Sequence, residues 1–405
     1  MQSRKASLPL LFSVVFMDMV GFGFIIPLIP DYISSFGGAP ALAGILMASY
    51  ALGQFFAAPI VGRLSDKFGR KPLLLFSIGG TFLSLILLGL APSLPFVFLS
   101  RILDGLTGGN ITVAQSYIVD ITDDKNRAKG FGIIGMAFGF GFIIGPLFGG
   151  LLSRFGLSTP AFVAAGIAAA NLLLILFILP ESLSADRREQ LRKNPRRSFS
   201  GKLLIETLRK KGTGVVLQMI MVYSFAFTLF ESMFALFAAE ALGVGPGERG
   251  WLLAYVGVLV ALVQGGGVGI LAKRFDERKL TAVAISAAAV SLGLYSLAPS
   301  VPLLMVALVP LSLSSGVTST MLRTLLTKSV PKEASGGTLG LAASIDSLNR
   351  ILAPLAGGLL LALLGPRSPG LAAAALAVVG AVYAWRRLVN EDCLGLSAQP
   401  GACDA

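Results

Sequence analysis

The sequence predicts an all-α membrane protein in which twelve transmembrane helices form two pseudo-symmetric halves of six. Of the 405 residues, 55% are hydrophobic and only 13% are charged, which is typical of a chain embedded in a bilayer and not of a soluble domain. Apolar blocks of about 20 residues recur along the whole length, and each is long enough as a helix to cross roughly 30 Å of hydrocarbon. Two short motifs also recur at nearly one offset, which indicates an internal duplication.

The apolar blocks give the expected order of the helices. We expect spans at residues 8–29, 42–62, 72–91, 96–118, 130–152, 160–180, 214–238, 250–272, 280–298, 302–325, 336–362 and 368–387. The chain then divides into a first half at 1–180, a linker at 181–213, a second half at 214–388 and a tail at 389–405. Within the linker, the stretch GKLLIETLRKK is expected to form a short helix on the membrane surface. The first block has no small-residue cleavage pattern, so we expect it to be kept as a span.

The positions of the basic residues explain the net charge of +12. Most of the 33 Lys and Arg residues lie near the N-terminus or in even-numbered connections, whereas the opposite side holds only Arg154, Arg249 and Arg367. By the positive-inside rule, both termini and the linker face the cytoplasm. The basic charge therefore reflects topology, and no nucleic-acid partner is expected.

Two sequence matches define the duplication. GRLSDKFGRK, which begins at Gly62, returns as GILAKRFDER at Gly269, and PLFGG at Pro146 returns as PLAGG at Pro354. The offsets are 207 and 208 residues. Independent matches at one period indicate duplicated six-helix halves joined by the charged linker.

Metal-dependent and covalent chemistry have few residues to work with. Histidine is absent, and the two cysteines, Cys393 and Cys403, both lie in the tail. We therefore expect no disulfide framework, no Cys/His metal site and no cofactor. No nucleophile, base and oxyanion group can be assembled, so an enzyme is the least expected class.

The connection between the second and third spans carries a charged motif, which we expect to form a short turn. It reads Gly62-Arg-Leu-Ser-Asp66-Lys-Phe-Gly69-Arg70-Lys71. The glycines allow a tight turn and close helix approach, and Asp66 can sit against the positive N-terminal end of a neighbouring helix. The alternative interpretation is that the basic residues only anchor the turn on the cytoplasmic side.

The fifth span carries small residues and a proline at regular spacing. They are Gly132, Gly141, Gly145, Pro146, Gly149 and Gly150. Small residues let helices pack closely, and the proline bends its helix by removing a backbone hydrogen bond. An ordinary small-residue packing face is the alternative interpretation.

A third motif runs from Arg101 through Asp104 and Gly105 to Asp120 and Arg127. Arg101 and Asp104 are three residues apart on the fourth span, so they share a face and can partly neutralise one another. Charges inside hydrocarbon are costly unless they face water or a partner, which favours a functional role. A purely structural ion pair remains the alternative.

With these three motifs, the chain resembles the major facilitator superfamily and, within it, the twelve-span drug:proton antiporters related to tetracycline efflux proteins. The resemblance covers residues 10–390. It implies a major facilitator fold in a cell membrane, the inner membrane if bacterial, and a monomer that exchanges a small-molecule substrate for protons by alternating access.

The resemblance also implies roles for individual residues. Asp66 would contact the eleventh span, and Arg70 would pair with Asp120, so that the 62–71 turn, together with Arg127, acts as a conformational latch. The bend at Pro146 would favour export over uptake. Asp104 is not part of the general family pattern.

Carboxyl groups within the spans are the candidates for proton coupling. Asp18 stands alone in the first span, in a stretch similar to that of tetracycline efflux relatives, with no nearby countercharge. Glu231 lies in the seventh span, the symmetry-related helix of the second half. A carboxyl group that faces a cavity can take up and release a proton, so Asp18, Asp104 and Glu231 are the candidates. For Asp18, a hydrogen-bonded structural carboxyl is the alternative.

Polar and aromatic residues in the spans are expected to line a cavity suited to amphiphilic, aromatic ligands. They are Tyr50, Gln54, Arg101, Gln115, Tyr223, Phe227, Phe230, Phe234, Gln264, Asp346, Asn349 and Arg350. Asp346 and Arg350 are four residues apart and are expected to pair. Each aromatic residue taken alone is more often a packing residue.

The pattern specific to tetracycline carriers is incomplete. Ser84 stands where those proteins carry an aspartate in the third span, the ninth span has no acidic residue, and a histidine of the eighth span is missing. The sequence therefore does not predict metal-chelated tetracycline as the substrate. Three interpretations remain: export of hydrophobic or amphiphilic compounds against protons, proton-coupled uptake of a sugar or another metabolite, for which LPES at 179–182 is a faint indication, and a non-transporting membrane sensor.

Overall fold

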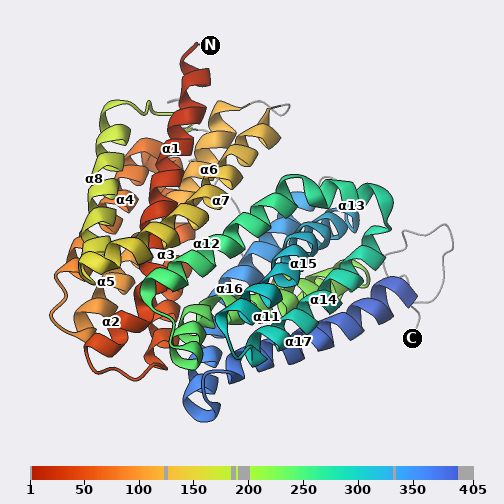
Figure 1. The fold of residues 1–405 in the computed structure, drawn as a ribbon. Coiled ribbons are helices and arrows are strands. Elements are labelled where there is room, and N and C mark those ends of the chain that lie inside the picture. The colour runs from red at the N-terminus through yellow and green to blue at the C-terminus, as the bar shows by residue number, and fades with distance from the viewer. Residues whose placement is uncertain (1, 123–125, 184–187, 190–200, 332–333, 391–405) are drawn as a thin grey trace. The chain divides into compact units, whose positions relative to one another are not determined.

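The structure is a computed structural model that describes residues 2–122, 126–183, 188–189, 201–331 and 334–390 (Figure 1). Every regular element in these residues is helical. The chain divides into two compact units, unit 1 with residues 1–197 and 243–257, and unit 2 with residues 198–242 and 258–405. Most of the expected tail, with both cysteines, lies outside the described residues.

Unit 1 holds the helices that begin the chain. They are α1 (Gln2–Ile25), the 3-10 turn η1 (Ile26–Leu28), α2 (Ile29–Ser35), α3 (Leu42–Phe68), α4 (Arg70–Gly89), α5 (Leu94–Thr107), α6 (Asn110–Ile121), α7 (Arg127–Leu152), η2 (Ser153–Phe155), α8 (Thr159–Phe177) and the start of α12 (Pro246–Leu262). α1 packs on α7 and α8, α3 packs on α5, and α4 packs on α5 and α8. The unit is therefore a bundle in which helices distant in sequence share interfaces.

Unit 2 is built in the same manner. It contains α10 (Gly201–Leu208), α11 (Thr213–Leu242), the end of α12, the π turn η3 (Val263–Gly267), α13 (Val268–Arg274), α14 (Glu277–Leu297), α15 (Val301–Lys328), α16 (Ser335–Leu364), α17 (Ser368–Ala384) and η4 (Trp385–Asn390). α14 packs on α15 and α17, and α11 packs on α16 and α17. A helix is present where one was expected in the linker, as α10.

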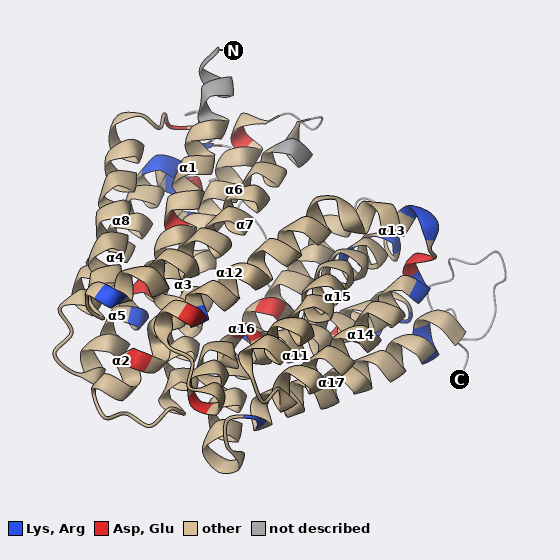
Figure 2. Cartoon of the chain, viewed as in Figure 1, with Lys and Arg blue, Asp and Glu red and all other residues tan. Residues whose placement is uncertain are grey.

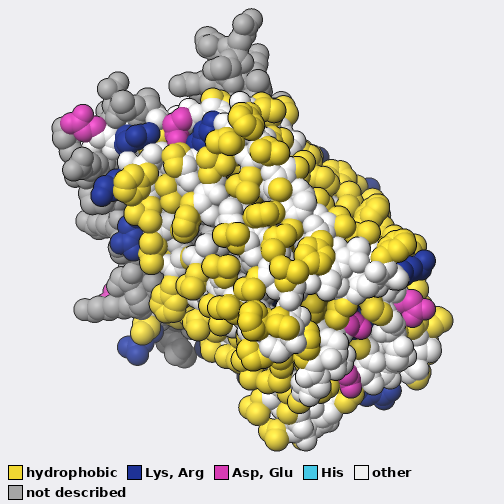
Figure 3. Space-filling view, turned by 90° about the vertical axis from the view of Figure 1, so that its left-hand side faces the viewer, with side chains coloured by type: hydrophobic (Ala, Val, Ile, Leu, Met, Phe, Trp, Pro, Cys, Tyr) yellow, Lys and Arg dark blue, Asp and Glu magenta, His cyan; other side chains and the backbone are white. Residues whose placement is uncertain are grey.

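The helices have the length and composition of membrane spans. Eleven helices among the described residues are long and apolar enough to cross a bilayer by these two measures. Their outer faces carry large apolar side chains, among them Phe76 and Leu173, each 55% exposed. Figure 3 shows one such face, where hydrophobic side chains predominate and charged side chains lie toward the edges. An apolar surface this extensive needs lipid rather than water as its solvent.

The fourth span differs from the prediction of one continuous helix over 96–118. α5 ends at Thr107 and α6 begins at Asn110, with Gly108 and Gly109 in non-helical conformations between them. Two successive glycines disfavour a helix because they lose the most backbone entropy on ordering. Val61 of α3 also occupies the space that a Cβ on Gly109 would need. Since neither half is long enough to count as a spanning helix, eleven spans are recognised by length instead of twelve.

Candidate functional site

A small pocket in unit 1 brings together charged side chains from helices that are distant in sequence. It is lined by Asp18, Met19 and Phe22 of α1, Tyr50 of α3, Thr81 and Leu85 of α4, Arg101 and Asp104 of α5, Gly108, and Asn110 and Ile111 of α6. Few Lys, Arg, Asp or Glu residues lie within the described helices (Figure 2). A pocket that contains three of them is therefore distinctive.

Arg101 and Asp104 form the expected ion pair inside this pocket. Arg101 Nη1 lies 3.2 Å from Asp104 Oδ2, and both residues are 6% exposed. The hydroxyl groups of Thr81 and Ser84 on α4 also lie against the Asp104 carboxylate. The Nη2 of Arg101 has no hydrogen-bond partner in the part of the chain that the structure describes. A buried charge pair of this kind needs several such polar neighbours to offset the cost of leaving water.

Asp18 binds a residue that sequence reasoning missed. The Nδ2 of Asn110 donates to Asp18 Oδ2 at 2.5 Å, and Asn110 Oδ1 accepts from the backbone N–H of Ile111 at 2.8 Å. Asn110 is the first residue of α6, so the Asp18 carboxylate also lies near the positive end of that helix. A Gly-Gly pair followed by asparagine is a helix-start signal, and it is the clue that could have identified this residue.

The charges in the pocket do not balance. Asp18 and Asp104 lie close enough to repel one another electrostatically, and Arg101 is the one cationic side chain in the lining. With both carboxylates ionised, the pocket carries one net negative charge. One proton, or one positively charged or donor group of a ligand, would neutralise it.

An apolar pocket adjoins the charged one. It is lined by Phe22, Ile25, Ile26, Ile29, Leu46 and Met47, and it shares Phe22, Tyr50 and Arg101 with its neighbour. Apolar walls with a few convergent polar groups are the usual features of a small-molecule site. The arrangement suits a compound with an apolar body and one polar end.

The other cavity candidates of the first half differ in whether they line these pockets. Tyr50 lines both pockets, and Gln54 on the same helix donates to the Tyr50 hydroxyl at 3.2 Å. Gln115 is exposed on α6 and lines neither pocket. The side chain of Arg127 lies outside those that the structure describes.

The candidates in unit 2 form a separate set. Glu231 is half-buried on α11 and has no polar partner among the described residues. Tyr223 and Phe227 stack with ring centroids 6.3 Å apart, and the series continues through Phe230 to Phe234. Gln264 is exposed on the π turn of the eighth span.

The expected pair between Asp346 and Arg350 is wrong. Asp346 Oδ1 accepts a hydrogen bond from Ser224 at 2.6 Å, and its Oδ2 lies 3.4 Å from Arg323 Nη2 on α15. Both carboxylate oxygens therefore face partners on other helices and not the residue one turn away. Arg350 is exposed instead, and Asn349 is buried and donates to the Met221 carbonyl at 3.1 Å.

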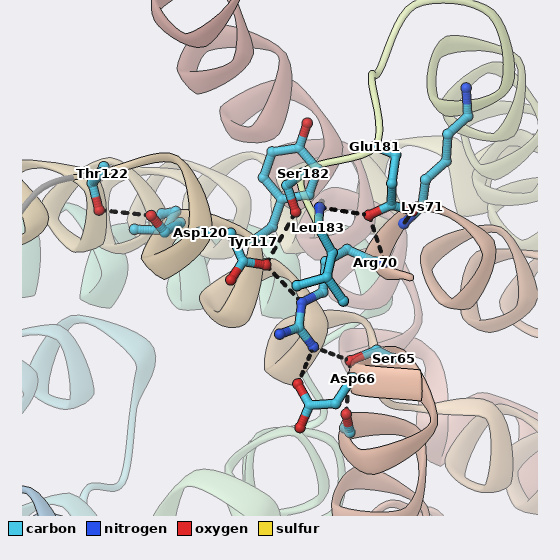
Figure 4. A network of polar contacts seen from close by, with 12 residues as sticks. Ser65, Asp66, Arg70, Lys71, Tyr117, Asp120, Thr122, Glu181, Ser182 and Leu183 are labelled. Carbon is cyan, nitrogen blue, oxygen red and sulfur yellow. Dashed lines mark hydrogen bonds and ion pairs between the residues drawn. The ribbon is translucent and has the colours of Figure 1, made fainter. Parts of the chain in front are cut away.

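A second polar cluster joins the ends of α3, α4 and α6 (Figure 4). We call it the Arg70 network, and it comprises Ser65, Asp66, Arg70, Lys71, Tyr117, Asp120, Glu181 and Ser182. The expected turn at 62–71 is mostly helical, because α3 continues to Phe68 and α4 begins at Arg70. Only Gly69 connects them, with φ at +109°, a value that favours glycine.

Arg70 is the centre of this network and is completely buried. Its Nη1 lies 2.6 Å from Asp66 Oδ1 and donates to Ser65 Oγ at 2.6 Å, while its Nε donates to Asp120 Oδ2 at 2.8 Å. The expected Arg70–Asp120 pair is thus present. The expected contact of Asp66 with the eleventh span stays a prediction.

The stretch LPES at 179–182 binds the same network, a role that sequence reasoning did not foresee. The Glu181 carboxylate accepts from the backbone N–H groups of Arg70 at 2.9 Å and Lys71 at 3.1 Å. It thereby caps the N-terminus of α4. Ser182 Oγ donates to Asp120 at 3.2 Å, and the Tyr117 hydroxyl donates to the Pro180 carbonyl at 2.7 Å. No local signal reveals this link, because the partners are more than 60 residues apart.

Unit 2 has an equivalent of this network with the charges reversed. At the repeat offsets of 207 and 208, Arg70 and Asp120 correspond to Glu277 and Lys328, whose Oε1 and Nζ are 2.7 Å apart. Asp276 caps α14 by accepting from the N–H groups of the two residues after Glu277, at 3.0 and 3.1 Å. Partial burial raises the pKa of Asp276, but hydrogen bonds from Lys279 and Arg278 outweigh burial and hold this pKa below its usual value.

The glycines of α7 differ in how closely they are packed. A Cβ on Gly145 would lie 2.7 Å from the Cα of Gly23 on α1, and one on Gly149 would collide with the backbone of Phe24. Gly132 has open space around it. Close packing of α1 on α7 therefore needs some of these glycines and not others.

One further ion pair joins α2 to the start of α12. Arg249 at the start of α12 is 1% exposed and binds Asp31 of α2, 218 residues earlier in the chain.

Among the described residues, no group of three or more carboxylate, histidine or cysteine side chains could hold a metal ion.

Comparisons with known proteins agree on one family. The model described as Major Facilitator Superfamily matches residues 11–232 and 216–394. The tetracycline resistance protein, class C, of Escherichia coli is 32% identical over 362 residues, which cover 88% of this chain and 89% of that protein. Multidrug resistance protein 2 of Bacillus subtilis is 30% identical over 278 residues, 68% of this chain and 69% of that protein. The human organic anion transporter MFSD10 has the same fold, with a TM-score of 0.70 at 20% identity, over 94% of this chain and 99% of that structure.

Proposed function

The chain belongs to the major facilitator superfamily, and from that premise we propose that it exports small hydrophobic or amphiphilic compounds in exchange for protons. The family makes it a multi-pass membrane transporter of a small molecule and not an enzyme. Relatives named for resistance to tetracycline and to multiple drugs support export as the direction of transport.

The observation that carries the proposal is the unbalanced pocket in unit 1. Asp18 and Asp104 face one cation, Arg101, so one proton can neutralise the site. A cargo molecule whose polar end binds these carboxylates would also neutralise the site, while its apolar body occupies the adjoining pocket. Because proton and cargo compete for one negative charge, binding of one releases the other, which is the requirement for antiport. We assign Asp18 and Asp104 the coupling role, with Glu231 as a further candidate.

The remaining candidates take supporting roles in the proposal. Movement of the halves at 1–180 and 214–388, which the linker joins, would open the binding site to each side of the membrane in turn. Both termini would lie in the cytoplasm, and the protein would act as a monomer in the cell membrane. The Arg70 network would act as a latch whose contacts form and break during the cycle. The closely packed glycines of α7 would keep α1 and α7 together while the site changes access.

Everted membrane vesicles test this function directly. Respiration or ATP acidifies the lumen, tetracycline or ethidium is added, and a pH-sensitive dye reports whether the proton store is discharged. We expect discharge by at least one amphiphilic compound with the wild-type chain. With Asp18→Asn we expect none, although the protein is inserted at the same level. Glu240→Gln, which neutralises an exposed carboxylate at the end of α11, is the matched control and should discharge normally.

Two results would contradict the proposal. Full proton-coupled efflux by Asp18→Asn would remove this residue from the coupling role. Absence of any response to a broad set of solutes would favour the sensor interpretation, and proton-driven accumulation in right-side-out vesicles would favour uptake.

A further inference from the structure

α6 connects the two polar clusters of unit 1. Its first residue, Asn110, binds Asp18 in the charged pocket, and the penultimate residue, Asp120, binds Arg70 and Ser182. The helix has 12 residues, so its two ends are roughly 18 Å apart at 1.5 Å per residue. A helix this short is stiff, and a shift at one end moves the other.

The backbone hydrogen bonds of α5 do not continue into α6. Gly108 N–H donates to Gly105, Gly109 N–H donates to Thr107, and the first bond of α6 runs from Val113 to Gly109. The regular hydrogen-bond series is therefore interrupted between the two helices. Because two glycines sit at the interruption, small changes of orientation between α5 and α6 need little backbone strain.

We propose that Asn110 is a positioning residue through which α6 transmits the protonation of Asp18 to the Arg70 network. The proposal rests on the proposed function, in which Asp18 gains and loses a proton. An ionised Asp18 attracts the start of α6 in two ways, by the charge-assisted bond from Asn110 and by the positive end of the helix. A neutral Asp18 makes a bond about half as strong and has no charge for the helix end to attract.

The other charged or titratable groups in the pocket belong to helices other than α6. Asp104 and Arg101 on α5 and the Tyr50 phenol on α3 line the same pocket, but α5 is separated from α6 by the glycine interruption. Asn110 is the one member of this lining whose side chain binds Asp18 and belongs to the helix that carries Asp120. Protonation of Asp18 should therefore loosen the far end of α6 and, through Asp120 and Ser182, the segment that holds Glu181 on α4.

Hydrogen–deuterium exchange of the purified full-length chain in detergent tests the connection without requiring transport. The reporters are the amides of Arg70 and Lys71, which the Glu181 carboxylate protects. Asp18→Asn, a neutral mimic of protonated Asp18, should raise their exchange rate roughly three- to tenfold, as expected when one charge-assisted hydrogen bond is weakened by about half. In Asn110→Leu the rate should already be raised, and adding Asp18→Asn should then change it much less than in the wild-type background, because only the attraction to the helix end is left to lose.

Asn171→Leu is the matched control. Asn171 of α8 is completely buried and donates to the Val14 carbonyl of α1 at 2.9 Å, and among the described residues it forms no hydrogen bond with α6. In this background, Asp18→Asn should keep its full effect on the two amides. An equal effect of Asp18→Asn with and without the Asn110 side chain, or no effect in the wild-type background, would overturn the proposal.

A second measurement covers the case in which Asn110→Leu does not fold. In the wild-type chain, acidification should lower the protection of the two amides, measured as the exchange rate after correction for the intrinsic slowing of exchange by acid, and Asp18→Asn should remove that loss of protection. Its persistence in Asp18→Asn would show that Asp18 is not its source and would refute the connection. Vesicle transport by Asp18→Asn is read separately, so that failure of proton coupling and failure of the α6 connection give different results.

Discussion

Replacing Arg70 with lysine keeps the positive charge of the 62–71 motif but removes its geometry. The guanidinium presents Nε to Asp120 and Nη1 to Asp66 at the same time, whereas a single ammonium cannot reach two carboxylates on different helices in this way. One ion-pair contact of a completely buried side chain is lost, and one largely buried carboxylate is left with less compensation. Breaking a buried ion pair costs about 3–5 kcal/mol, and because lysine keeps one partner, we expect a loss of about 3 kcal/mol.

Thermal unfolding in detergent measures this loss. For a unit of about 200 residues, each kcal/mol shifts Tm by roughly 2–4 °C, so Arg70→Lys should lower Tm by roughly 6–12 °C. Trp251 is the single tryptophan of unit 1 and Trp385 that of unit 2, so a Trp385→Phe background confines the fluorescence signal to unit 1. Lys71→Gln is the matched control: it removes a charge, but among the described residues the Lys71 Nζ donates only to the Leu176 carbonyl.

The control separates the two interpretations of the motif. If the basic residues were only anchors on the cytoplasmic side, Lys71→Gln should be the more harmful change, because it alone removes a charge. If the geometry of the Arg70 network matters, Lys71→Gln should cost only about 1 kcal/mol. A Tm for Arg70→Lys equal to or above that of Lys71→Gln would refute the reasoning.

The other predictions concern helix packing and the second network. Gly145→Ala should destabilise the chain by about 1–3 kcal/mol, because the new Cβ would lie 2.7 Å from the Gly23 Cα, whereas Gly132→Ala, in open space, should be neutral or slightly stabilising in the same Tm assay. Equal effects of the two alanines would contradict the packing argument. Glu277→Lys and Lys328→Glu should each cost at most about 1 kcal/mol because the pair is partly exposed, and the double exchange should restore Tm; a double variant no better than either single one would show that the pair contributes nothing.

The sequence was sufficient for the positions of most helices and for one of the two ion pairs expected from helical spacing. Apolar blocks predicted the positions of the spans, because only a long apolar helix satisfies both its backbone and its side chains in lipid. Helical spacing also predicted that Arg101 and Asp104 meet. The Arg70–Asp120 pair followed from the family resemblance and not from any local pattern.

Residue spacing along one helix could not predict contacts between different helices. Spacing favoured Arg350 as the partner of Asp346, but Arg323 and Ser224 from other helices take both oxygens. The sequence did not identify Asn110 because a fourth span predicted as one helix has no free N–H groups at the start of α6. The role of Glu181 depends on a segment that returns after 110 residues, and no periodicity encodes such a return.

The Arg70 network and its equivalent in unit 2 share two features, a capped helix start and an ion pair between helices. In both units a helix begins where the motif ends, and its free N–H groups need a carboxylate. Unit 2 supplies it locally with Asp276, whereas unit 1 has Gly69 at the corresponding position and takes Glu181 from the segment after α8. The cross-helix ion pair tolerates reversal of its charges, since attraction between the partners depends on their opposite signs and not on which helix carries which. Among the described residues, unit 1 alone ties its cap to a distant segment, and α6 leads from that cap to a carboxylate in a pocket. Any response of a network to protonation of Asp18 should therefore be confined to unit 1 and absent from the Asp276 cap.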